Sequence, residues 1–153
     1  MRENIKMPER VCILGLGQMG GSLALALKKR QLCKEVIGYS LYQQEIDQAL
    51  AMKAVDSAYT NIADAVKDAD LCILAMPVEP LIAFVKENAA LFRKGSIVTD
   101  ISSVKSIIAD QVRPLFSEQG VHFIGSHPMA GNEKSGLATA NDDLYKNTVI
   151  FIC

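Results

Sequence analysis

The sequence has no long hydrophobic run and no marked excess of charge of either sign. No apolar stretch approaches the roughly 18 residues that a membrane-spanning helix needs, and the N-terminal MRENIKMPER lacks the apolar segment of a secretory signal. Charged residues make up 22% of the chain, and the formal net charge is −1. This balance favours neither a basic nucleic-acid binder nor an acidic disordered chain. We therefore expect a soluble, cytoplasmic protein whose partner is a small molecule, with no nucleic acid and no membrane.

The cysteines lack the spacing of a metal site or a redox motif. Cys12, Cys33, Cys72 and Cys153 form no C-x-x-C pair and no Cys/His ligand pattern. Three of them lie in apolar, strand-like runs, where a reduced, buried thiol is the ordinary explanation. The pattern favours a reducing, intracellular compartment, and we expect no metal.

Glycines cluster where an apolar run meets a helical stretch, in the segment VCILGLGQMGGS at residues 11–22. Its first four residues predict a strand buried on both faces, and Gly15, Gly17 and Gly20 match the G-x-G-x-x-G spacing. In this pattern the first glycine makes the tight turn, the second lets a pyrophosphate approach the backbone, and the third lets the helix pack on the sheet. The N–H groups and the positive end of the helix dipole then face the phosphates.

A glycine pattern alone also fits a flexible connection, but its surroundings favour a nucleotide site. The helix 19–30 and a second strand at 35–39 complete a βαβ unit. Continued alternation predicts an α/β fold with a doubly wound, mainly parallel sheet of the Rossmann type. A chain of 153 residues suits one such domain rather than two. We assign residues 11–153 to a dinucleotide-binding domain, after a polar lead-in at 1–10 that we expect to be disordered at its start. The later predicted strands are 71–75, 96–99, 121–125 and 148–153, and the later helices are 43–52, 62–67 with Asn61 as N-cap, 81–92 and 104–116.

The end of the second strand bears on which dinucleotide fits. An NAD site has Asp or Glu there for the ribose hydroxyls, about 20 residues past the glycines, whereas a 2′-phosphate needs a basic partner. Ser40 stands at this position, without an acidic residue and without Arg or Lys beside it. A serine hydroxyl can bind either group, so NADP and NAD both stay open, with a lean to NADP. Glu45 and Asp47 are assigned to the solvated face of the helix 43–52.

The strand 71–75 ends in Met76 and Pro77, and proline there stops the strand ladder where ligands bind in such sheets. The predicted cofactor-binding residues are Gly15, Gly17, Gln18, Met19, Gly20, Ser40, Met76, Pro77 and Ser103.

A second polar stretch, DISSVK at residues 100–105, follows the strand 96–99. One of Ser102 and Ser103 is expected to cap the next helix, because serine is a favoured N-cap. The other hydroxyl then lies at the carboxyl edge of the sheet, near a nicotinamide. Lys105 is assigned to a solvated charge in preference to a substrate ligand.

A histidine follows the end of the strand 121–125. His127 precedes Pro and Gly, which predicts a loop beside the ligand crevice, whereas His122 belongs to the strand itself. A lone loop histidine is often only a surface residue, but an imidazole here can accept a proton from a hydroxyl as hydride leaves the same carbon. Ser103 could orient it. Residues 133–135 add charged and polar groups to the rim, or form an ordinary polar loop.

Three blocks together resemble the nucleotide-binding domain of prephenate and arogenate dehydrogenases: GLGQMGGSLA at residues 15–24, TDISSVK at 99–105 and GSHPMAGNEKSG at 125–136. The resemblance implies an NAD- or NADP-dependent oxidative decarboxylation in tyrosine biosynthesis. Prephenate would become 4-hydroxyphenylpyruvate, or arogenate would become tyrosine. By the same resemblance His127 matches the catalytic histidine, and Ser103 matches the serine between that histidine, the nicotinamide and the substrate. Glu133 matches the acidic residue at the mouth of the site.

The sequence departs from the family pattern at several places. Ser102 and Ser126 stand where glycine is common, and Ser40 is similar to the residue of NADP-using members. The helical second domain, which in the family makes the homodimer and supplies an arginine for a substrate carboxylate, does not follow residue 153. We therefore expect a fragment of a longer enzyme, with little or no turnover by itself.

Two other functions stay open. Another β-hydroxyacid or 6-phosphogluconate-type dehydrogenase shares the glycine turn, although it would use a lysine base, and the HPMAG block argues against it. A non-catalytic module that senses NAD(P) is the other alternative. Residues 1–153 do not discriminate prephenate from arogenate, and they leave feedback by tyrosine open.

Overall fold

The computed structural model describes residues 7–131 and 133–153, and the expected disorder at the start of the lead-in lies outside them, at residues 1–6. In the described residues no helix is long and apolar enough to cross a membrane. The strands are β1 Arg10–Leu14, β2 Glu35–Tyr39, β3 Ser57–Tyr59, β4 Leu71–Leu74, β5 Ile97–Asp100, β6 His122–Pro128 and β7 Ile150–Ile152. The helices are α1 Gln18–Lys29, α2 Gln43–Ala51, α3 Ile62–Val66, α4 Val78–Asn88 and α5 Lys105–Glu118, with short 3-10 turns η1 Ala89–Leu91 and η2 Leu137–Thr139.

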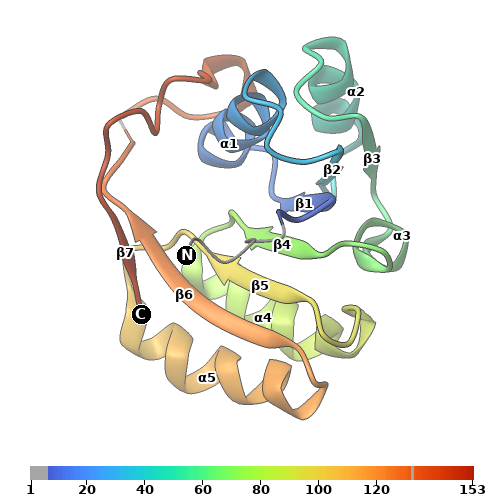
Figure 1. The fold of residues 1–153 in the computed structure, drawn as a ribbon, viewed down its shortest axis with the longest axis vertical. Coiled ribbons are helices and arrows are strands. Elements are labelled where there is room, and N and C mark those ends of the chain that lie inside the picture. Colours follow the sequence, from blue (N-terminus) through green and yellow to red (C-terminus); the bar gives the residue numbers. More distant parts are fainter. Residues whose placement is uncertain (1–6, 132) are drawn as a thin grey trace, which may run out of the picture.

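The strands form one sheet in the order β3-β2-β1-β4-β5-β6-β7. Every neighbouring pair is parallel except β6 and β7, which run antiparallel. Helices α1 and α2 lie on one face of the sheet, and α4 and α5 lie on the other (Figure 1). The chain leaves the carboxyl ends of β1 and β4 in opposite directions, so these two ends frame the crevice where such sheets bind ligands. The predicted doubly wound, mainly parallel sheet is confirmed.

Strand β1 contributes to two hydrophobic clusters, because successive side chains of a strand point to opposite faces. Cys12 and Leu14 belong to the cluster that includes α4 and α5, whereas Val11 and Ile13 belong to the cluster that includes α1 and α2. All four side chains have 0% exposure. Helices on both faces therefore explain why the strand is apolar without a break, as the sequence predicted.

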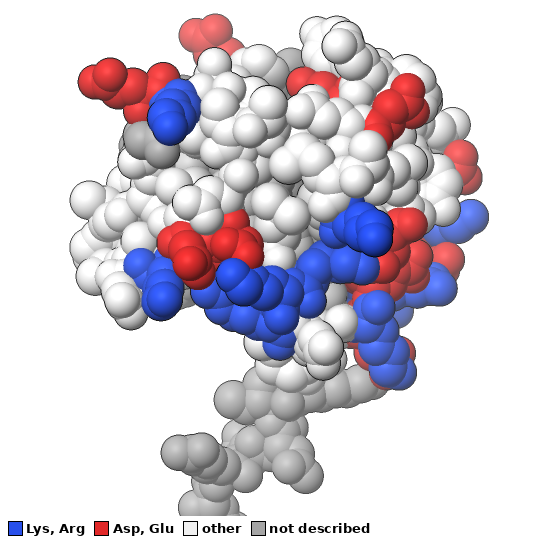
Figure 2. Space-filling model, turned by 90° about the horizontal axis from the view of Figure 1, so that it is seen from above, with Lys and Arg blue, Asp and Glu red and all other residues white. Residues whose placement is uncertain are grey.

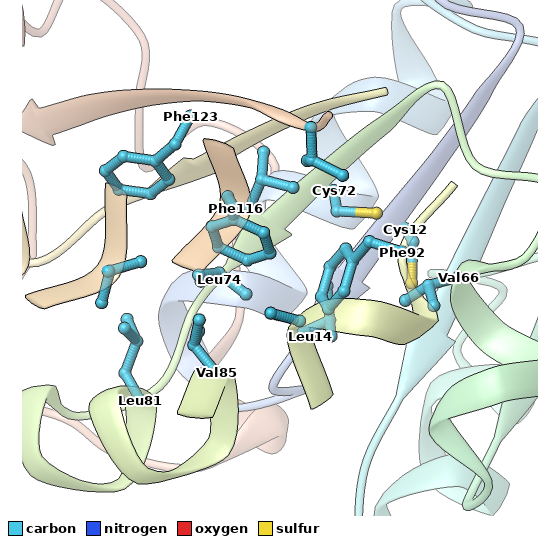
Figure 3. Close-up of a cluster of buried hydrophobic side chains, with 14 of the residues drawn as sticks. Cys12, Leu14, Val66, Cys72, Leu74, Leu81, Val85, Phe92, Phe116 and Phe123 are labelled. Carbon is cyan, nitrogen blue, oxygen red and sulfur yellow. The ribbon is translucent and has the colours of Figure 1, made fainter. Parts of the chain in front are cut away.

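Three phenylalanines belong to the cluster that includes α4 and α5 (Figure 3). The ring of Phe116 on α5 lies 5.0 Å from that of Phe92, edge to face, and 5.9 Å from that of Phe123, stacked. Leu81 and Val85 reach the same cluster from α4 (Figure 3). These contacts hold the last turn of α5 against the sheet.

The chain between β6 and β7 crosses over α1 (Figure 1). The Asn141 N–H donates to Ser22 Oγ at 2.9 Å, and the Tyr145 hydroxyl donates to the Met19 carbonyl at 3.0 Å. Burial raises the pKa of the Tyr145 phenol, so this donor stays neutral. We call residues 133–148 of this connection the cover segment.

Ion pairs join the cover segment to the end of α1. Lys29 Nζ lies 2.6 Å from Asp142 Oδ2, and Arg30 Nη2 lies 3.2 Å from Asp143 Oδ1. Figure 2 shows that Lys and Arg on this side of the molecule lie beside Asp and Glu instead of forming a broad patch of one sign. Such exposed pairs stabilise a fold only weakly, by about 0–1 kcal/mol each, so packing carries most of this contact.

Several predicted boundaries differ from the observed ones. Helix α4 begins at Val78 instead of residue 81, because Pro80 sits in the first turn, where a backbone N–H has no intrahelical acceptor to lose. The predicted strand 148–153 is reduced to β7, and Cys153 is exposed rather than buried. The capping prediction for Asn61 is confirmed, since its side chain accepts the Ala63 N–H at 2.9 Å.

Candidate functional site

The glycine turn joins the ends of three neighbouring strands. Gly15 has a φ of +107°, and a Cβ at this residue would lie 2.5 Å from the Ala75 carbonyl oxygen after β4. The Gly15 N–H donates to the Tyr39 carbonyl of β2 at 3.0 Å. A Cβ at Gly20 would lie 2.0 Å from the Gly15 carbonyl oxygen, so α1 starts directly against the turn. Glycine is therefore required at both positions, for the geometric reasons that the sequence indicated.

The N-terminus of α1 is open to an anion. Gly17, the N-cap residue, has no side chain with which to cap the helix, and no described atom lies within 4 Å of a Cβ built there. A cavity of ≈ 400 Å³ lies at this point, lined by Gly17 and Met19 on one side and by Met76 and Pro77 on the other. The first N–H groups of the helix and the positive end of its dipole are thus available to a phosphate group.

The cover segment closes one side of this first cavity. Lys134, Ser135 and Gly136 line it together with Gln18, whose amide donates to Thr139 Oγ1 at 3.1 Å. The sequence placed residues 133–135 at the rim of the site, and it did not indicate that the cover segment also holds the glycine turn in place. The reason is that all these contacts join residues more than a hundred positions apart.

A second cavity, of ≈ 310 Å³, lies beyond the end of β2 and shares Met76 and Pro77 with the first. Ser40 and Glu45 both line it. Glu45 was assigned to the solvated face of α2, and this is wrong: its carboxylate is half-buried and accepts a hydrogen bond from the Ser40 hydroxyl at 2.5 Å. Asp47 on the same helix is exposed, as predicted. The first turn of α2 therefore brings a carboxylate to the position where the strand end has none.

Asp100, the last residue of β5, organises the loops on the other side of the crevice. Its side chain has 0% exposure and accepts hydrogen bonds from the Ser102 N–H at 3.1 Å and from the Ser126 N–H at 3.3 Å. The Ser102 hydroxyl and the Lys105 ammonium group also donate to it. The carboxylate thus joins the loop after β5 to β6.

This network overturns two expectations. Neither Ser102 nor Ser103 caps α5, whose N-cap residue is Val104 without a side-chain hydrogen bond, because the Ser102 hydroxyl is drawn to Asp100 instead. Lys105 is not a solvated charge: it pairs with Asp100 and donates to the Ser126 carbonyl at 2.7 Å. The Asp-x-x-x-x-Lys spacing was visible in the sequence, but the contact of Lys105 with Ser126 depends on β6 lying beside β5.

His127 lies on a strand and not on the predicted loop. Strand β6 pairs with β5 only up to Gly125, and its last three residues pair with β7 instead, with His127 opposite Phe151. The sequence could not reveal this because the extension depends on an antiparallel partner more than twenty residues later. His127 is half-buried, and His122 at the other end of β6 is exposed.

His127, Ser103 and Glu133, the three predicted catalytic residues, are not among the described residues that line the two cavities. Ser103 and Glu133 are exposed, each next to a residue that lines the first cavity, namely Ser102 and Lys134. Within residues 7–131 and 133–153, no cluster of three or more His, Cys, Asp or Glu side chains is suited to hold a metal ion.

The chain returns to the glycine turn soon after His127. A Cβ built at Gly131 would lie 3.6 Å from the Met19 sulfur, so this residue passes close to the start of α1. The segment after β6 therefore borders the first cavity, although His127 itself is not among its lining residues.

The strand order, the glycine turn and the glycine N-cap of α1 together define a nucleotide-binding domain of the Rossmann type. Residues 23–153 match the family described as prephenate dehydrogenase, nucleotide-binding domain. The chain belongs to this family, and the resemblance seen in its motifs is confirmed.

Relatives and solved structures agree with this assignment. Prephenate dehydrogenase of Bacillus subtilis (strain 168) is 35% identical over 146 residues, which cover 93% of this chain and 38% of that protein. The crystal structure of prephenate dehydrogenase from A. aeolicus in complex with hydroxyphenyl propionate and NAD+ has a TM-score of 0.86 at 27% identity, covering 98% of this chain and 51% of that one. Synechocystis arogenate dehydrogenase has a TM-score of 0.85 at 29% identity, covering 94% and 49%. The chain thus spans about half the length of these structures, and less of the Bacillus protein.

Proposed function

We propose that the protein binds NAD or NADP and forms the nucleotide-binding part of a prephenate or arogenate dehydrogenase. The reaction is the oxidative decarboxylation of prephenate to 4-hydroxyphenylpyruvate, or of arogenate to tyrosine, in tyrosine biosynthesis. Membership of the family supports this function. So do the NAD+ named in the A. aeolicus structure and the arogenate dehydrogenase named for Synechocystis.

A bound dinucleotide would span the two neighbouring cavities, which share two lining residues. A pyrophosphate at Gly17 would meet the N–H groups of α1 without a Cβ in its way. The adenosine half would extend into the cavity beside Ser40, and the nicotinamide half into the cavity between Met19 and Ile101. Met76 and Pro77, which line both cavities, would lie along the middle of the molecule.

The observation that carries the catalytic part of the proposal is the contact between Gly131 and Met19. It brings the segment that starts at His127 to the cavity at the glycine turn. The buried Asp100 supports the same arrangement, because it binds both Ser102 at the cavity wall and Ser126, the neighbour of His127. Such anchoring restricts the geometry of the histidine, and restricted geometry is a large part of enzymatic rate enhancement.

His127 is the proposed general base, which accepts the proton of the substrate's ring hydroxyl. When bound, the nicotinamide accepts the hydride from the carbon that carries this hydroxyl. Removal of both leaves a carbonyl across the ring from a carboxylate, and aromatisation then drives the loss of carbon dioxide. Ser103 would orient the imidazole and the substrate, and Glu133 would lie at the mouth of the site. A base of this kind contributes about 10²–10⁴-fold to a rate.

The test compares His127→Asn with His122→Asn in the protein as its gene encodes it. Turnover of prephenate, arogenate and simple 3-hydroxy acids is measured with each coenzyme, and coenzyme affinity is measured by calorimetry. We expect His127→Asn to lower kcat at least about 100-fold while leaving coenzyme affinity within about twofold. His122→Asn, an exposed substitution on the same strand, should change neither quantity.

The outcomes separate the candidate functions. If His127→Asn retains normal turnover of prephenate or arogenate, the proposed role of the imidazole is wrong. If no substrate is converted while coenzyme binding alters the activity of a partner protein, the sensing module is favoured instead. Turnover of only the 3-hydroxy acids would favour the β-hydroxyacid group.

Other expectations belong to the same proposal. We propose a cytoplasmic location, since the four cysteines are free thiols, as a reducing compartment allows. A homodimer formed through a helical domain stays a prediction, as does the low turnover expected of residues 1–153 alone. Both are checked by measuring oligomeric state and activity for residues 1–153 and for the gene-encoded protein side by side.

A further inference from the structure

We propose that Glu45 reads the adenosine ribose of the dinucleotide and makes the protein selective for NAD over NADP. This inference rests on the proposed coenzyme binding and goes beyond it, because it names a specificity residue that is not at the end of β2. It also reverses the slight preference for NADP that was inferred from Ser40 alone.

The position of Glu45 follows from how α2 begins. The helix starts at Gln43, two residues after Leu41, so its first turn lies directly over the end of β2. Glu45 belongs to that turn, where the positive end of the helix dipole favours a carboxylate. Its side chain is half-buried and lines the second cavity, next to Ser40.

The hydrogen bonds of Ser40 decide which ligand it can still bind. Its hydroxyl donates to Glu45 Oε2 at 2.5 Å and accepts the Tyr42 N–H at 3.1 Å. A serine hydroxyl has one donor and two acceptor sites, so only one acceptor site is left. A ribose hydroxyl can donate to it, whereas a phosphate group that has lost its protons cannot.

The charges around the cavity point the same way. Glu45 is the one ionisable acid among the described lining residues, and those residues include no Lys or Arg. A 2′-phosphate carries a charge of about −1.5 to −2 at neutral pH and would face this carboxylate without a cation. The 2′- and 3′-hydroxyls of NAD can instead donate to the carboxylate, as they do to the acidic residue of other NAD sites.

The rest of the cavity suits an adenine ring. Its wall includes Leu41, Tyr42 and Pro80, together with Phe84, whose ring lies 5.7 Å from that of Tyr39. These apolar surfaces can cover both faces of a flat base, and ligand sites commonly combine such walls with few polar groups. Ser40 and Glu45 are the polar side chains on this wall that can orient the sugar, apart from the tyrosine hydroxyls.

The experiment is a pair of calorimetric titrations with NAD+ and NADP+ on the purified protein and three variants. We expect the wild type to bind NAD+ at least tenfold more tightly, which corresponds to about 1.4 kcal/mol. Glu45→Gln keeps the size of the side chain and removes its charge, and should lower the preference to below about threefold. Glu45→Lys should reverse it. Asp47→Asn removes the same charge from the exposed face of α2 and should leave the preference unchanged.

Each outcome decides the proposal. Equal or tighter binding of NADP+ by the wild type overturns it, and so does a preference for NAD+ that Glu45→Gln leaves intact. If the wild type binds neither dinucleotide, coenzyme binding itself is refuted and the assignment of Glu45 falls with it. Thermal unfolding of each variant shows that it is folded, and Glu45→Lys provides a gain of NADP+ binding that misfolding cannot mimic.

Discussion

Replacing Asp100 by Asn tests whether the buried carboxylate holds the two loops of the site together. The wild-type side chain has 0% exposure, and Lys105, its charge partner, has a side chain only 19% exposed. Removing one member of a buried ion pair costs about 3–5 kcal/mol, because the other charge is left without its partner. We take the lower end, about 3 kcal/mol, since Lys105 keeps some contact with water and with the Ser126 carbonyl.

The assay is urea unfolding followed by circular dichroism, with thermal unfolding as a second measurement. A loss of about 3 kcal/mol should lower Tm by ~6–12 °C in a chain of this size. The double variant Asp100→Asn, Lys105→Met should lose less free energy of unfolding than the sum of the losses in the two single variants. Each single change leaves one member of the same ion pair without its partner. Asp110→Asn is the control, because Asp110 is exposed on α5, and its change should stay within about 0.5 kcal/mol.

A loss below about 1 kcal/mol in Asp100→Asn would refute the structural role of the carboxylate, and additive single variants would refute its coupling to Lys105. Loss of stability without loss of the proposed turnover, measured in the protein as its gene encodes it, would separate the structural role of Asp100 from the proposed positioning of His127.

Two further predictions follow from the glycine turn and from the acid titration of the fold. Gly20→Ala should lower the free energy of unfolding by about 1–3 kcal/mol, because its Cβ would lie 2.0 Å from a backbone oxygen. Gly17→Ala should leave the free energy of unfolding unchanged and weaken dinucleotide binding at least tenfold. Equal stability of the two variants would contradict this. The pKa of Asp70 is lowered by the Arg10 N–H, which donates to it, and by Arg93. A carboxyl group whose pKa is depressed by folding stabilises the fold above its ordinary pKa near 3.8, and this contribution is lost as the pH falls through the folded-state pKa. Asp70→Asn should therefore flatten the loss of stability below about pH 5. Parallel pH profiles of the wild type and the variant would contradict the assignment.

Local pattern was sufficient for most of the fold. Strand β2 was predicted with its observed ends, and β1 and β4 within one residue, because strands covered on both faces are apolar without interruption. The glycine spacing between β1 and α1 indicated the turn correctly, since its requirements lie within six residues of chain. The start of α4 was missed because proline is equally compatible with a break and with the first turn of a helix.

The candidate site was predicted less evenly. All the residues expected at the glycine turn and after β4 except Gly20 line the two cavities, because the carboxyl ends of parallel strands meet at one edge. The surroundings of Ser40, Lys105 and His127 were not foreseen. Each depends on a partner from another element: Glu45 from α2, Asp100 from β5 and the pairing of β6 with β7.

The sequence alone determined the sheet, the phosphate turn and the family motifs. Hydrophobic periodicity and glycine spacing are local patterns of a few residues, and what they predict does not depend on how the rest of the chain folds. Tertiary structure alone decided which charges are buried and which face a cavity. Glu45 and Asp47 lie two positions apart on one helix, yet one lines the second cavity and the other is solvated. The energy of a charge depends on what surrounds it in space, and those neighbours come from distant parts of the chain.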